Sequence, residues 1–348
     1  MRRRRTQETV REFALQGFVA KTRIADGWRN GSVQIPKCRV AAMKWIDPEG
    51  AVVREPPSNW ETQRVKVPGR RILLVIGLAS LMCESALAAP ARVRINGSAG
   101  IGYDSNVGAA QANDDKFDSA FYSASVAADY VVPVGQQVSV TLRGQLQGDA
   151  YDRFDDLSNA RLLGLVRAAW KPNPGFFTPT FSGWTSIARL EYGSEIRTGS
   201  EFRGGAFVSQ QLTTAISMRL EGKGFHRKAD GRVFDMSGQS LATSLNWSMA
   251  PAVSTLLAFE YQTGDAFSMS SENPRIAAIA DAIEPDDAFD DRVAYRLDAR
   301  TRIVTAGANW RFAPDWALDA QLQSISVDGD GGNQYDRLIA VVGLLARF

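Results

Sequence analysis

The chain has almost no cysteine or histidine: its 348 residues include 2 Cys and 1 His. Both cysteines, Cys38 and Cys83, lie in the first quarter, so the rest of the chain can form no disulfide and no thiolate site. The single histidine, His226, excludes metal sites built from several imidazoles, and no Gly-rich phosphate loop is present. The sequence therefore predicts no cofactor and no metal site.

A long hydrophobic run is also lacking. The longest, residues 72–83, has 12 residues, whereas a membrane-spanning helix needs about 20. Basic residues precede the run, and the small-residue site Ala86-Leu87-Ala88 follows it, as in a secretory signal peptide. We predict that 65–88 is that signal peptide and that 89–348 is the mature domain. Residues 1–64 are then a mis-annotated, disordered extension; a genuine N-terminal domain is the alternative.

The basic balance of the whole chain comes from this leader. Residues 1–88 hold 16 of the 40 Lys and Arg residues and 8 of the 38 Asp and Glu residues, which leaves the mature chain at a net charge of −6. An acidic mature chain gives no support to nucleic-acid binding.

From residue 92 onward, apolar and polar residues alternate with a period of two. In 137–151, for example, Val138, Val140 and Leu142 share one face, and Thr141 and Arg143 lie on the other. Most such segments have 12–15 residues, enough for a tilted strand to cross a bilayer. The pattern predicts an all-β fold, a transmembrane up-and-down antiparallel β-barrel of about 12 strands. The expected strands are 92–104, 118–131, 137–151, 158–171, 183–196, 201–212, 215–227, 233–249, 253–264, 294–312, 316–328 and 334–348.

Short proline-marked turns alternate with longer polar loops, the asymmetry of bacterial barrels with periplasmic turns and extracellular loops. An even strand number places both ends of the barrel on the periplasmic side. Aromatic residues predict two interfacial girdles, because their rings prefer the headgroup layer. Trp170, Trp184, Trp247, Trp310 and Trp316 lie near the short turns, and Tyr103, Tyr151, Tyr192, Tyr261 and Tyr335 near the long loops. A soluble β-sandwich is the alternative.

Two segments resemble known outer-membrane barrels. The last strand, 337–348, ends in Phe348 and is similar to the C-terminal signal that the barrel-assembly machinery recognises. The segment Gly102-Tyr103-Asp104-Ser105-Asn106-Val107 is similar to the first strand of a β-barrel porin family and of the barrel of surface lipoprotein assembly modifiers. The resemblance implies the outer membrane of a Gram-negative bacterium. The expected partners are outer-membrane lipid, lipopolysaccharide and, through Phe348, the assembly machinery.

The inward face of such a barrel would carry its function. We predict a pore for passive diffusion of small polar or charged solutes, with opposite charges on opposing walls forming a transverse field. The predicted pore-lining residues are Arg143, Arg167, Arg189, Glu191, Arg219, Glu221, Lys223 and Glu260. The alternatives are a non-conducting barrel in which these charges pair, a surface-interaction barrel acting through loop 264–294, and a lipoprotein assembly or export factor. The absence of a helical repeat in 1–88 weighs against the last.

Catalysis is not expected. His226 stands near the outer end of a strand with no serine within two residues, although a neighbouring strand could supply one. The loop 264–294 holds eight acidic residues, which we expect to be solvated or bridged to lipopolysaccharide by divalent ions. It has no complete calcium-binding pattern.

Overall fold

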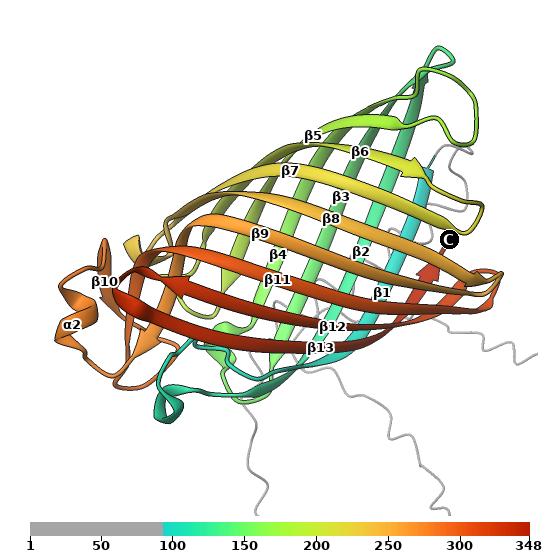
Figure 1. Ribbon diagram of the computed structural model, residues 1–348. Coiled ribbons are helices and arrows are strands. Elements are labelled where there is room, and N and C mark those ends of the chain that lie inside the picture. The colour runs from blue at the N-terminus through green and yellow to red at the C-terminus, as the bar shows by residue number, and fades with distance from the viewer. Residues whose placement is uncertain (1–92) are drawn as a thin grey trace, which may run out of the picture. The chain divides into compact units, whose positions relative to one another are not determined.

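The computed structural model describes residues 93–348, which form one closed antiparallel barrel (Figure 1). The extension and signal peptide predicted within 1–88 lie outside the described residues. Within 93–348, no helix combines the length and the apolar character needed to cross a membrane.

Twelve long strands and one short strand make up the sheet. Each long strand pairs with its neighbours along the chain, and the pairings β1–β13 and β9–β11 close the ring. The predicted up-and-down barrel of 12 strands is therefore confirmed, and the short strand β10 was not predicted. The strands are β1 (Val93–Asp104), β2 (Ser119–Val134), β3 (Val138–Tyr151), β4 (Asn159–Trp170), β5 (Thr180–Tyr192), β6 (Gly199–Gln211), β7 (Ile216–Ala229), β8 (Met236–Ala250), β9 (Val253–Ser270), β10 (Ala282–Pro285), β11 (Val293–Ala313), β12 (Trp316–Gly329) and β13 (Asn333–Arg347).

The outward face of the barrel is apolar around its whole circumference. Each of the twelve long strands carries at least one large, exposed apolar side chain on this face, because alternate residues point to opposite sides of a strand. Examples from the twelve strands are Ile101, Tyr122, Leu142, Leu162, Ile187, Phe202, Leu220, Leu241, Leu257, Val304, Leu322 and Val342. Such a surface is unfavourable in water, and it suits contact with lipid.

Aromatic residues border this apolar surface at the end with the short turns, here called the turn end. Trp170, Trp247, Trp310 and Trp316 point outward there, as predicted, and each is at least 41% exposed. At the opposite, loop end, Tyr103 and Tyr261 also point outward. The prediction was wrong for four aromatic residues, whose strand positions place them on the inward face: Trp184, Tyr151, Tyr192 and Tyr335.

The two ends of the barrel sequence meet at the turn end. The backbone N–H of Phe348 donates to the carbonyl of Ile95 at 2.8 Å, which extends the β1–β13 ladder to the last residue. The short turn between β2 and β3 contains Gly135 at φ +76°, a left-handed conformation that favours glycine. An even number of long strands thus brings both ends to one side, as expected.

The predicted loop 264–294 is a folded element at the loop end. β9 continues to Ser270, the single-turn helix α2 (Pro274–Ala277) follows, and β10 then pairs with the first residues of β11. We call residues 264–297 the mouth hairpin. Figure 1 shows α2 and β10 at the loop end of the barrel.

Candidate functional site

The inward face of the barrel carries an excess of positive charge. Eleven cationic side chains occupy inward strand positions: Arg94, Arg143, Arg161, Arg167, Arg203, Arg219, Lys223, Arg227, Arg311, Arg337 and Arg347. Seven carboxylates share this face: Asp104, Asp129, Asp149, Glu201, Glu221, Glu260 and Asp319. The lumen wall is therefore net cationic, although the barrel sequence as a whole is acidic.

Six of the eight predicted pore-lining residues do point into the lumen. They are Arg143, Arg167, Arg219, Glu221, Lys223 and Glu260.

The carboxylates hold several of these cations through short contacts. Arg143 pairs with Asp129 on the adjacent strand β2 at 2.6 Å. Lys223 pairs with Glu260 at 2.9 Å, across the intervening strand β8. Ion pairs of this kind, between near neighbours in one wall, fix the side chains in place without bridging the lumen.

Arg189 and Glu191 were wrongly predicted to line the pore. Both point outward from β5, on the face of the exposed Ile187, and they pair with each other at 2.8 Å. The inward face of that strand instead carries Trp184 and Ala188. Near the loop end of β5 the charged residues Arg189 and Glu191 point outward and the apolar Ala188 and Leu190 point inward, so the polar face is there the outward one.

Sequence reasoning missed a second group of inward charges. Glu201, only 7% exposed, accepts from Arg161 at 2.9 Å and from Arg203 at 2.8 Å. The Trp184 indole N–H donates to Glu221 at 2.8 Å, the same carboxylate that pairs with Arg219. These contacts join residues on β4, β5, β6 and β7, and only the strand register shows that they meet.

The charges gather on one side of the lumen. Ten of the eighteen inward charges lie on β3 to β7. The middle of the inward face on β11, β12 and β13 carries uncharged side chains, namely Thr301, Ile303, Thr305, Gln321, Gln323, Ile325, Ile339 and Val341. The predicted transverse field between oppositely charged walls is therefore wrong: a mainly cationic wall faces a neutral one.

The cationic wall contains a hollow of about 320 Å³. Four guanidinium groups and two carboxylates contribute to its lining, with the apolar side chains of Phe207 and Leu165 among them. The charged residues are Arg94, Arg143, Arg167, Arg219, Asp129 and Glu221. Arg219 lies over the Phe207 ring, 3.5 Å from its centroid. Arg167 donates to the Thr141 hydroxyl at 3.3 Å and forms no ion pair among the described residues. This wall can attract and orient an anion.

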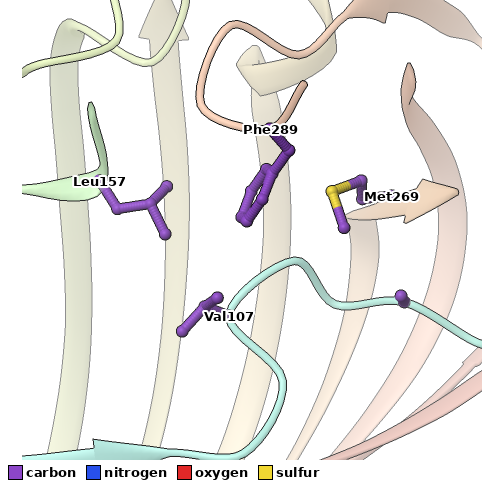
Figure 2. Packing of buried hydrophobic residues seen from close by; sticks show 5 residues of the cluster. Val107, Leu157, Met269 and Phe289 are labelled. Carbon is purple, nitrogen blue, oxygen red and sulfur yellow. The ribbon is translucent and has the colours of Figure 1, made fainter. Parts of the chain in front are cut away.

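The mouth hairpin packs against the loops at the loop end through an apolar cluster. Met269 and Phe289 of the hairpin contact Val107 of the β1–β2 loop and Leu157 of the β3–β4 loop, and Figure 2 shows these side chains pointing toward one another. The Phe289 ring stacks on Phe117 with a centroid distance of 5.7 Å. Contacts between connections from different parts of the ring place the hairpin over the mouth.

Polar contacts extend this closure around the ring. Arg197 of the β5–β6 loop meets Asp286 at 2.5 Å, and both side chains are buried. Glu284 accepts from the backbone N–H of Val233, in the β7–β8 connection, at 3.3 Å. Ile279 lies against Gly331 of the β12–β13 turn. The hairpin thus contacts all five other connections at the loop end.

Two features of the mouth store electrostatic or backbone strain. Partial burial raises the pKa of Asp156 above its ordinary value, and the nearby carboxylates of Asp287 and Asp155 raise that pKa further. Among the described residues, the non-glycine positions with positive φ are Ala109, at +55°, and Asp291, at +56°. One lies in the β1–β2 loop and the other in the hairpin that closes on it, and such backbone strain is concentrated at functional segments.

The acidic residues of 264–294 are only partly solvated, contrary to expectation, since Asp286 is buried and Glu284 accepts a hydrogen bond from the backbone of Val233. Carboxylate oxygens of Asp265, Asp281 and Asp298 lie within 4.8 Å of one another. Asp281 and Asp298 are exposed, and the three residues bring one ligand atom each to this place, whereas Ca²⁺ takes six to eight. They do not define a metal site.

His226 points outward, and Ser237 lies directly opposite it in the β7–β8 ladder. A nucleophilic serine requires a hydrogen bond to its base. The Ser237 hydroxyl instead donates to Asp265 at 3.0 Å, and within 93–348 no hydrogen bond joins it to His226. The arrangement is not that of an activated serine.

No protein-family model and no curated protein sequence matches the chain. Among solved structures, the chain is similar to an outer membrane channel from Pseudomonas putida F1, with a TM-score of 0.52 at 12% identity over 75% of this chain and 97% of that one. It is also similar to the KdgM porin, with a TM-score of 0.38, 9% identity and coverage of 72% and 99%. The NanC porin gives a TM-score of 0.39, 7% identity and coverage of 72% and 98%. The first similarity shows the fold alone, a closed antiparallel barrel.

Proposed function

We propose that this chain is an outer-membrane channel through which small polar or charged solutes diffuse, with a preference for anions. The observation that carries the proposal is the excess of inward cations, eleven against seven carboxylates. Pores lined by Arg and Lys favour anions, because the wall lowers the electrostatic cost of anion entry. The apolar outward face supports a location in the outer membrane, reached by way of the signal peptide at 65–88.

The mouth hairpin supports a gated form of this channel. It contacts every other connection at the loop end through buried side chains, including Met269 and Asp286, and it contains one of the two strained non-glycine residues. A solute would pass when the hairpin moves.

The same hairpin favours a second candidate function, a non-conducting barrel that presents a structured surface. In that case the inward charges are a structural network. The two candidates differ in whether release of the hairpin opens a water path.

The test is conductance of the purified full-length chain in a planar bilayer, under a KCl gradient. A matched variant replaces residues 271–292 by Asn-Gly, because Ser270 and Val293 already pair across β9 and β11 and a two-residue turn can join them. We expect larger and more frequent steps from the trimmed variant, with an anion-selective reversal potential. A folded but silent trimmed barrel would establish the non-conducting alternative, and a cation-selective reversal potential would contradict the anion preference.

A further inference from the structure

A polar groove lies on the outward face of the barrel at the loop end. It has a volume of about 440 Å³ and crosses from the β1–β2 loop over β13 and β12 to β11, strands that lie side by side in Figure 1. Its polar lining on this face consists of Gln111, Lys116, Arg300, Arg302, Ser326, Asp328, Gln334 and Asp336.

The groove lies directly above the apolar surface. On β11 the outward positions run from the exposed Val304 to Arg302 and then Arg300. Two residues along a strand span about 7 Å, so Arg302 lies one such step above the apolar band and Arg300 two. On β13, the outward Leu338 lies in register with Val304 through Ser324 of β12, and Asp336 is the next outward residue above it. With the apolar band in the hydrocarbon layer, Arg302 and Arg300 lie at the level of the lipid headgroups on the loop side of the membrane.

The two arginines differ from the other outward strand cations at this end. Arg189, Lys228 and Arg296 each have a carboxylate partner. Within the described residues, neither Arg300 nor Arg302 forms an ion pair or a side-chain hydrogen bond. Exposed arginine side chains without partners are available to a ligand.

The two carboxylates of the groove already accept hydrogen bonds from neighbouring side chains of the barrel wall. Asp328 accepts from the Gln334 side chain at 3.0 Å, and Asp336 accepts from the Ser326 hydroxyl. With Lys116, the groove has a net charge of +1, and its free charged donors are the two guanidinium groups and the Lys116 ammonium group. Guanidinium binds phosphate oxygens through two parallel hydrogen bonds.

We propose that Arg300, Arg302 and Lys116 bind a phosphate group on the headgroup of a lipid in the outer leaflet, as on lipopolysaccharide. The lipid's acyl chains then lie along Val304, Leu322 and Leu338, directly below. A basic pocket beside an apolar surface suits an anionic lipid better than a free ion. This site requires the barrel to be in the membrane, and it does not depend on conduction.

The test measures binding of lipid A bisphosphate to the purified full-length chain by native mass spectrometry. We expect the double variant Arg300→Gln/Arg302→Gln to weaken binding about tenfold, the effect of roughly 1.4 kcal/mol. The control Arg189→Gln/Lys228→Gln removes two outward cations elsewhere, and its affinity should change less than twofold. Unaltered migration on unheated gels shows that each variant is folded.

Two further ligands distinguish the sources of phosphate. Dephosphorylated lipid A should bind wild type and double variant equally. Inorganic phosphate at millimolar concentration should not displace the lipid; efficient displacement would assign the groove to free phosphate and overturn the lipid assignment. Equal binding of the bisphosphate by wild type and double variant, or an equal loss in the control, would also overturn it.

Discussion

Arg197 and Asp286, from two separate connections at the barrel mouth, meet at 2.5 Å, and both are almost fully withdrawn from solvent. The guanidinium also lies over the Phe234 ring, 4.2 Å from its centroid. The pair joins the β5–β6 loop to the mouth hairpin, so it holds the hairpin in its closed position. Breaking one partner of a buried pair costs about 3–5 kcal/mol, because the other charge is left without compensation.

Arg197→Ala should therefore release the hairpin. We expect faster amide hydrogen exchange in residues 282–296 and more frequent conductance steps. The matched control is Arg275→Ala, which removes an exposed arginine of the same hairpin that forms no ion pair among the described residues. Unchanged exchange in Arg197→Ala would show that the apolar cluster alone keeps the hairpin closed.

Arg167 and Arg189 provide a test of which charges face the solute. Arg167 points inward without an ion pair, and Arg189 points outward. Arg167→Gln should lower the ratio of anion to cation permeability about twofold at 0.1 M salt. The effect should shrink at 1 M salt, where the Debye screening length is only about 3 Å. Arg189→Gln should leave the ratio unchanged. A similar shift in both variants would contradict the assignment of faces on β5.

The pKa of Asp156 predicts a pH dependence of the mouth. In the closed mouth, burial raises this pKa and the hairpin carboxylate of Asp287 raises it further, so the ionised form opposes closure. This cost is present at neutral pH and disappears as the pH falls through the raised pKa, above the ordinary value of 3.8. We expect fewer open events as the pH is lowered from 7 toward that range. Asp156→Asn should show the closed behaviour already at pH 7, with a weaker response to pH.

A methyl group at Gly231 should disturb the same closure by steric means. A Cβ atom there would lie 2.8 Å from the Ile196 carbonyl oxygen and 2.7 Å from Glu284 Oε2. Gly231→Ala should destabilise the closed mouth by about 1–3 kcal/mol, seen as faster hydrogen exchange in residues 230–235 and 282–285. Gly222→Ala, on β7, is the control, because its Cβ would meet nothing within 4 Å. Equal exchange in the two variants would contradict the tight packing of this loop.

The strands were predictable because the alternation of polar and apolar residues within each strand reflects the two environments that its faces contact. In β3, alternate residues face lipid and lumen, so the period of two appears in 137–151 without knowledge of any partner. The predicted segments match the observed strands closely, for example 253–264 against the longer Val253–Ser270 and 294–312 against Val293–Ala313. The extra length of β9 belongs to the mouth hairpin, whose pairing needs tertiary contacts.

The lumen was only partly predictable. Arg219, Glu221 and Lys223 lie opposite clearly apolar outward residues such as Leu220, and their direction was correct. Arg189 and Glu191 lie on a strand end that projects toward the loops, where the outward face no longer needs to be apolar. Strand register, rather than sequence, brings Arg161 to Glu201 across 40 positions of the chain.

The barrel, its number of long strands and the end with the short turns follow from local alternation and turn chemistry, so they could be predicted from the residues alone. Only the folded structure shows which charges meet in the lumen, that they gather on one wall, and that the acidic segment 264–294 closes the mouth. Those properties depend on curvature and register around a closed ring, which bring together residues that the sequence keeps far apart.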